Sequence, residues 1–141
     1  MQIAQAGGNL DLTAIENVGA GFPDGLSRIE SIEIVDLATD TAANTLTLTV
    51  ADVIDMAGMN LFTTSNTTAV SGTSLGASVA KHQIMITGGA EDYANIGVSN
   101  WTLSTTVVTY GSRNYKVYNA NSSVYAQVLV DQNIVNAGHV L

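Results

Sequence analysis

Carboxylates are the most numerous ionisable side chains in this sequence. The chain has 12 Asp and Glu residues, against four Lys and Arg and two His. Carboxylate oxygens are hard ligands of the kind that Ca²⁺ prefers, and a calcium site takes six or more oxygens. Two pairs stand out by their spacing: Asp36 and Asp40 flank one polar connection, and Glu91 and Asp92 follow Gly88-Gly89. Calcium is therefore the candidate cofactor, with these four acids as candidate ligands.

Each of these acids also has a structural interpretation. An Asp at the start of a loop accepts a hydrogen bond from the backbone two residues on, so Asp36 and Asp40 also fit turn formation. The standard calcium-binding nonapeptide G-G-x-G-x-D-x-U-x is absent after Gly88-Gly89, because its fourth position is Glu91 and its sixth is Tyr93. Turn formation is the stronger interpretation for the first pair, and Glu91 with Asp92 is the pair that local structure explains least.

The sequence argues against a nucleophilic enzyme. A Ser or Thr nucleophile needs a base beside it, and the candidate histidines are His82, which begins a strand-like run, and His139, which lies near the end of the chain. Paired acids could cleave a glycoside only at a suitable folded separation, whereas the even scatter of the acids favours a solvated surface. We expect a protein that is not an enzyme.

Aromatic residues offer a candidate contact surface for sugar rings. They are concentrated in the C-terminal half, at Trp101, Tyr110, Tyr115, Tyr118 and Tyr125. Aromatic residues in strands, however, more often pair across neighbouring strands and fix their register. The sequence leaves both interpretations open and favours pairing or core positions.

Composition narrows the class of protein. The chain has 141 residues, of which 46% are hydrophobic and 11% charged, with a net charge of -8 and no cysteine. This length predicts one domain, residues 1–141. The acidic balance argues against nucleic acid as a partner. No apolar run approaches the roughly 18 residues of a membrane span, and residues 1–8 lack the pattern of a signal peptide. An acidic, lysine-poor chain without cysteine favours an extracellular location.

The elements that must position these residues are strands joined by short helical turns. Apolar runs at 32–37 and 45–50 flank a polar connection at 38–44, and both predict strands. Val50, Val53, Ile54 and Ala57 then follow the spacing of one helix face. Thr49 is the predicted N-cap of this helix, with Asp52 at the third helical position and Asp55 on the same short helix.

A short motif recurs along the chain. The sequence from Leu10 to Thr13 reads L-x-L-T, and the same letters recur 36 residues later from Leu46 to Thr49. Thr13 and Glu16 repeat the capping spacing, and 27–30 holds a third variant. Similar strands joined by helical crossovers are most simply parallel. The prediction is a mainly β fold with short parallel β-solenoid-like coils and brief helical turns, with a two-sheet β-sandwich as the alternative.

The rest of the chain divides into three parts. Residues 58–80 are nearly free of charge and have no sustained period, which predicts a polar loop insertion held by Leu61, Phe62, Val70, Leu75 and Val79. In 81–135 a strand at 81–87 precedes an antiparallel meander, with strands at 101–110, 115–118 and 124–130 and a last short strand near 134–135. Residues 136–141 are predicted to be a frayed tail after the strand and helical-turn units of 9–57.

Several motifs together resemble a known bacterial module. They are I-E-I-V-D-L at 32–37, N-T-L-T-L-T-V-A-D-V-I-D at 44–55, G-G-A-E-D-Y-A-N-I at 88–96, Trp101-Thr102-Leu103 and the Y-K-V-Y hairpin at 115–118. From about Leu10 to Val135 the chain resembles a module of large type I-secreted bacterial repeat adhesins and biofilm-associated surface proteins, which often carry calcium-binding RTX repeats. The resemblance implies a secreted structural or adhesive part with no activity of its own.

Three functions follow as expectations. The first is a non-enzymatic structural or adhesive module of an extracellular bacterial surface or matrix protein, stiffened by calcium and associating with neighbouring modules or identical subunits through sheet edges. The second is a carbohydrate-binding or carbohydrate-acting β domain that contacts surface glycans through the tyrosines and Glu91 or Asp92. The third is a filament or phage structural subunit. Neither nucleic acid nor membrane insertion is expected for any of them.

Overall fold

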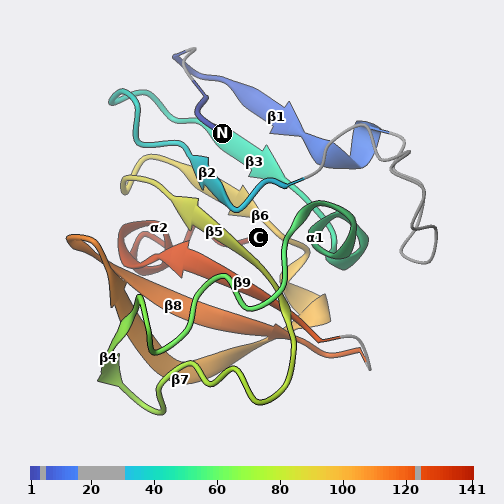
Figure 1. The fold of residues 1–141 in the computed structure, drawn as a ribbon. Coiled ribbons are helices and arrows are strands. Elements are labelled where there is room, and N and C mark those ends of the chain that lie inside the picture. Colours follow the sequence, from blue (N-terminus) through green and yellow to red (C-terminus); the bar gives the residue numbers. More distant parts are fainter. Residues whose placement is uncertain (4–5, 16–30, 123–124) are drawn as a thin grey trace.

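The protein is mainly β, with two sheets that combine parallel and antiparallel pairing (Figure 1). A computed structural model describes residues 1–3, 6–15, 31–122 and 125–141. In chain order the strands are β1 (Asn9–Asp11), β2 (Ile34–Asp36), β3 (Thr45–Thr47), β4 (Thr68–Ser71), β5 (His82–Thr87), β6 (Tyr93–Asn95), β7 (Trp101–Tyr110), β8 (Arg113–Ala120) and β9 (Ala126–Asp131). The predicted variant at 27–30 and the capping residue Glu16 lie outside the described residues.

A three-stranded parallel sheet joins segments that are far apart in sequence. Its order is β1-β3-β6, with Leu10 opposite Leu46 and Leu46 opposite Ala94. The offset between Leu10 and Leu46 is the 36 residues of the L-x-L-T repeat. The prediction that the two copies of this motif form parallel strands is therefore confirmed.

The six-stranded sheet changes from parallel to antiparallel halfway across. Its order is β2-β5-β9-β8-β7-β4, in which β2, β5 and β9 are parallel and the pairs from β9 to β4 are antiparallel. Gln2 adds a parallel bridge to Asp36 at the outer edge of β2. The predicted meander of β7, β8 and β9 is confirmed, and β7 has the bounds expected from the sequence.

Helix α1 (Val50–Met56) begins where the hydrophobic period changes. Thr49 is its N-cap, and the Thr49 hydroxyl and the Asp52 carboxylate form the capping box that the sequence predicts. The first copy of the motif behaves differently. Asp11 caps the short 3-10 helix η1 (Leu12–Ala14) by accepting a hydrogen bond from the Thr13 backbone N–H, so Thr13 lies inside the helix and the prediction of Thr13 as the cap was wrong.

Two predictions at the C-terminus were also wrong. Residues 132–136 form helix α2 (Gln132–Asn136) instead of a strand, because the Asp131 carboxylate accepts the Asn133 N–H and starts a helical turn. The final residues are not a frayed tail. Val140 forms a parallel bridge to Ala94, and the Leu141 N–H donates to the Ala94 carbonyl at 3.0 Å. The chain end thus extends the three-stranded sheet beyond β6.

The hydrophobic residues form two clusters on opposite faces of the six-stranded sheet. The larger cluster fills the space toward β1, β3, β6 and α1, and includes Leu46, Ile84, Val128 and Ile134. The smaller cluster contains Phe62, Leu75, Met85 and Leu129. Because side chains alternate along a strand, Ile84 and Met85 belong to different clusters. The segment 58–80 covers the second face.

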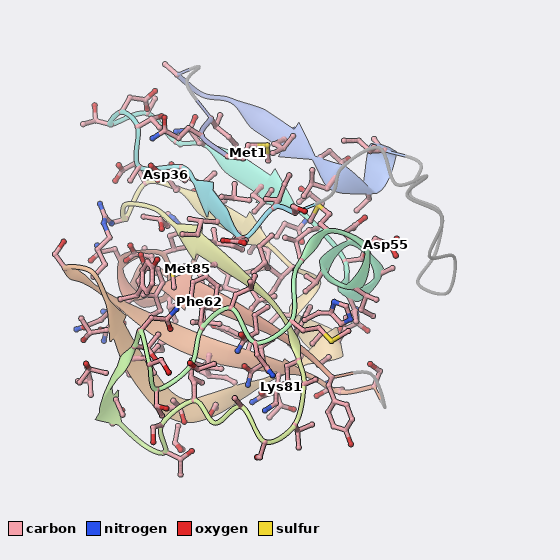
Figure 2. The ribbon with its side chains drawn as sticks, viewed as in Figure 1. Met1, Asp36, Asp55, Phe62, Lys81 and Met85 are labelled. Carbon is pink, nitrogen blue, oxygen red and sulfur yellow. The ribbon has the colours of Figure 1, made fainter. Side chains whose placement is uncertain are left out.

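The prediction of a polar loop at 58–80 was therefore only partly right. The segment contains strand β4, which pairs with β7, and Phe62 and Leu75 are buried. Phe62 of this segment and Met85 of β5 belong to the same hydrophobic cluster, and Figure 2 shows them close together. Val70 and Val79 were expected to anchor the segment, but they are 57% and 40% exposed. Two buried anchors and one strand pairing hold the segment on the sheet.

Candidate functional site

Two buried polar residues lie just before strands of the three-stranded sheet, at the corner where the chain enters that sheet. Asn44 and Asp92 are both fully buried, one just before β3 and the other just before β6. The Asn44 N–H donates to Asp92 Oδ1 at 2.9 Å, and the Gly89 N–H donates to Asp92 Oδ2 at 2.8 Å. The candidate ligand Asp92 is therefore an acceptor for two backbone donors inside the fold.

The same arrangement repeats one level up. The Gly8 N–H donates to Asn44 Oδ1 at 2.9 Å, and Asn44 Nδ2 donates to the Leu37 carbonyl at 3.1 Å. Asn44 and Asp92 thus each accept the N–H of the preceding level, and we call this stack of Gly8, Asn44 and Asp92 the corner ladder. Each rung satisfies a buried backbone donor that would otherwise carry a desolvation cost.

Asp36 and Asp40 form the turns that the sequence favoured for them. Asp36 Oδ1 accepts the Ala38 N–H at 3.1 Å, and Asp40 Oδ1 accepts the Ala42 N–H at 2.8 Å. Asp40 also lies 3.4 Å from Asn44 Nδ2, which places it beside the corner ladder. Each carboxylate accepts the N–H two residues on, as expected for an Asx turn.

Glu91 is half-buried and lies over the preceding loop. A Cβ placed on Gly89 would come within 2.3 Å of Glu91 Oε1, so a glycine at 89 leaves the space that this side chain fills. Within the described ranges, no group of three or more His, Cys, Asp or Glu side chains is arranged to hold a metal. Asp40 and Asp92 both contact Asn44. Asp36 does not contact Asn44; its carboxylate accepts the Ala38 N–H in the turn after β2.

A second set of ionisable groups surrounds the end of α1. Burial, reinforced by the charge of Asp52, raises the pKa of Asp55, while His82 opposes the rise. His82 Nδ1 lies 2.9 Å from the Ala57 carbonyl, which fixes the ring against the chain that leaves α1. Asp55 and Asp36 lie on different sides of the molecule (Figure 2), so these acids do not converge on one point.

His139 is held by the last turn of the chain. Its ring stacks on Tyr93 with a centroid distance of 3.9 Å and an interplanar angle of 17°. Its Nδ1 lies 3.2 Å from the Asp92 carbonyl oxygen. Both histidine rings thus engage backbone carbonyls, and the contacts of His139 fasten the end of the chain to β6.

The candidate aromatic residues do not share one exposed surface, although Tyr125 is 61% exposed. Trp101, Tyr115 and Tyr118 are buried. Tyr110 is half-buried, and its ring centroid lies 5.4 Å from that of Phe62 in an edge-to-face arrangement. Trp101 Nε1 donates to the Ile96 carbonyl, and Tyr115 shares a hydrogen bond with Thr87 at 3.0 Å. Burial raises the pKa of both Tyr115 and Tyr118. These rings serve the core, because a buried ring cannot stack on a sugar.

An open polar cavity of about 400 Å³ lies between the β7–β8 turn and α2. Arg113 forms an ion pair with the buried Asp131 at 2.6 Å and donates to the Gly88 carbonyl at 3.0 Å. The Asp131 hydrogen bond raises the pKa of Arg113. Amide side chains complete the cavity: Asn114, Gln132, Asn133 and Asn136. The cavity therefore presents neutral amide groups around the Arg113–Asp131 ion pair.

The most informative polar residues were missed by the sequence analysis. Asn44 was considered only as part of a motif. Asn44 and Asp92 are 48 residues apart, and each comes just before a strand. This shared position of two side chains that can accept a hydrogen bond is the signal that could have revealed the ladder. Gln83 was noted only as part of a strand. It is buried, and it bonds both the N–H and the carbonyl of Phe62 as well as the Gln127 side chain.

Within the described part of the chain, no helix has the length and apolar character needed to cross a bilayer. Comparison with family models, with curated proteins and with solved structures finds no match for this chain. The resemblance to adhesin modules therefore depends on the sequence motifs.

Proposed function

We propose that this chain is a non-enzymatic structural or adhesive module of an extracellular bacterial surface or matrix protein. It acts by association with neighbouring modules or identical subunits. The observation that carries this proposal is the repeated parallel pairing of β1, β3 and β6 beside β2, β5 and β9, with buried acids used to hold backbone donors. Shape and backbone pairing, instead of reacting side chains, then supply the function.

The proposed architecture is a short parallel β-solenoid whose coils each give one strand to each sheet. Four such units follow in chain order: Gln2 with β1, β2 with β3, β5 with β6, and β9 with Val140. Two features favour this arrangement over a β-sandwich. The three-stranded sheet is entirely parallel, and successive units stack in chain order at matched positions in both sheets.

The use of polar groups supports a structural function. In the described ranges, every buried side-chain nitrogen or oxygen has a hydrogen-bond partner. Asp92 and Asp131, the most buried acids, are each committed to backbone donors or to Arg113. An extracellular location is supported by the neutral polar composition, the absence of cysteine and the adhesin-like motifs.

Beads coated with the purified chain test this function. We expect coated beads to cluster with one another or attach to surfaces coated with bacterial matrix, while albumin-coated beads stay dispersed. If Asp36, Asp40 and Glu91 hold calcium, 1–5 mM Ca²⁺ raises the melting temperature and EGTA reverses the rise. Beads that neither cluster nor attach, with and without calcium, would contradict the adhesive function.

Carbohydrate binding is the second candidate, and the amide-lined cavity beside Arg113 is the observation that favours it. Neutral amides and one paired guanidinium suit sugar hydroxyls. A glycan array separates the two functions. A glycan that binds the wild type but not Asn136→Leu would support a lectin-like function, whereas an empty array leaves the structural proposal ahead.

A further inference from the structure

Strand β4 lies at the end of the six-stranded sheet farthest from β1 (Figure 1). All four of its residues, Thr68 to Ser71, are exposed. Among the described strands β4 pairs with β7 alone. Every edge strand has backbone N–H and C=O groups that point away from its sheet, and these groups form a template for another strand.

This edge is fixed in place. Gly72 has φ +72°, and a Cβ at this position would lie 2.8 Å from the Thr106 Cα, so the backbones of the two segments are closely packed. Thr106 Oγ1 donates to the Thr73 carbonyl at 3.1 Å, and Ser71 Oγ donates to the Thr105 carbonyl at 3.2 Å. The buried Phe62 and Leu75 anchor the segment on either side of β4. A partner would therefore meet a strand that is already ordered, which lowers the entropic cost of pairing.

The edge also carries no charge in a strongly acidic protein. Residues 56–80 and 93–112, which include β4 and β7, contain no Asp, Glu, Lys, Arg or His, although the net charge of the chain is -8. Natural edge strands are commonly protected by shortness, bulges, lysine, proline or inward-pointing charge; β4 is short and bulged, but it has no proline and no charged residue. A second copy that approaches this edge meets less like-charge repulsion than it would elsewhere.

We infer that β4 is a homotypic interface, at which two copies pair β4 to β4 in an antiparallel, two-fold arrangement that joins their six-stranded sheets. This inference rests on the proposed associating function and names its partner as a second copy of this chain. The two-fold arrangement places the same neutral strand on both sides and closes after two subunits. The strand has four residues and a bulge between Ala69 and Ser71, so the contact is short and the dimer depends on protein concentration.

A pair of matched variants tests the interface. Val70→Lys places a charge on the edge, where the two-fold axis brings two copies of it together. Val98→Lys adds the same charge at a similarly exposed valine, which is 44% exposed against 57% for Val70. Val98 lies on the short 3-10 helix η2 (Val98–Asn100), just before β7. Sedimentation velocity from 5 µM to 1 mM, with circular dichroism to check folding, should show dimerisation in the wild type and Val98→Lys. Val70→Lys should weaken it at least tenfold.

Cysteine cross-linking gives a second readout, which reports whether the two β4 strands lie close together in the dimer. The chain has no cysteine, so a single Val70→Cys provides one thiol per subunit. A short bismaleimide should link Val70→Cys into a covalent dimer at concentrations where Val98→Cys stays monomeric.

Three results would overturn the interface. They are a wild type that stays monomeric at 1 mM, equal dimerisation of the two lysine variants, and equal cross-linking of the two cysteine variants. These failures remain distinct from failure of the adhesive function. If any of these three results is found while beads coated with the wild type still cluster or attach to matrix, the β4 interface is wrong and the adhesive function still holds.

Discussion

The two ends of this molecule use polar residues in opposite ways. At the corner ladder, Asn44 and Asp92 are fully buried and each accepts a backbone N–H from the level above. At the β4 edge, Thr68 and Ser71 are exposed and uncharged, and the strand's outer backbone faces solvent. Buried polar groups fix how strands stack, whereas exposed neutral ones leave an edge open to a partner.

The largest effect is expected at the base of the corner ladder. Asp92→Ala removes the acceptor of both the Asn44 and the Gly89 N–H. Each buried donor left without a partner costs about 1–3 kcal/mol, so we expect the free energy of unfolding to fall by about 3 kcal/mol. Urea denaturation measures the fall. The matched control Asp40→Ala removes a turn acceptor at a half-buried site and should cost under about 1 kcal/mol. Equal costs for the two variants would contradict the ladder.

A smaller and more local effect is expected where the β4 segment is attached to the sheet. Gln83→Leu removes the acceptor of the Phe62 N–H and the donor to the Phe62 carbonyl and Gln127. We expect a loss of about 2 kcal/mol, concentrated in residues 58–80. Hydrogen exchange should quicken at Phe62 and at β4 before it quickens at β3. Uniform acceleration across both sheets would mean that the segment is no separate unit.

The capping box of α1 should contribute less than either buried network. Thr49→Ala removes the hydroxyl that accepts the Asp52 N–H, and losing such a cap costs about 1 kcal/mol. Thermal unfolding followed by circular dichroism measures the cost. Thr13→Ala in the first copy of the motif is the control, because Asp11 is the cap there. A larger cost at Thr13 than at Thr49 would reverse the structural assignment of the two copies.

The smallest effect concerns pH. Because the pKa of Asp55 is raised in the folded protein, the folded state binds this proton more tightly than the unfolded state does. Stability is therefore gained as pH falls through the raised pKa and is lower above it. Asp55→Asn should slightly raise the melting temperature at pH 7, and the difference should vanish at pH 3, where the carboxyl is protonated in both states. A variant less stable than wild type at pH 7 would show that the charged carboxylate is favourable.

The sequence predicted the elements whose signals are local. The Thr49 and Asp52 spacing marked the start of α1, and the aromatic and β-branched run from Trp101 to Tyr110 marked β7. The L-x-L-T repeat predicted parallel strands, and its 36-residue offset equals the register of β1 with β3 in the structure. In the first two cases the contacts that form the element join residues close in sequence, and in the third the same short motif occurs twice.

Features decided by distant contacts were not predictable in this way. β4 forms because Gly72 can approach Thr106, more than 30 residues away, in a stretch that has no strand period of its own. Residue type left the aromatic residues open between a contact surface and core positions, because burial of Trp101 and Tyr118 depends on how the sheets pack. The corner ladder joins Gly8 to Asn44 and Asn44 to Asp92 across 36 and 48 residues.

Amide hydrogen exchange of the wild-type chain at 5 µM and at 1 mM tests the association account most directly. If the chain acts through its sheet edges, exchange should slow on association at the exposed amides of β4 (Thr68–Ser71), while the amides around Arg113 and Asn136 stay unchanged. Association that slows exchange at the polar cavity and leaves the β4 edge unaffected would contradict the account.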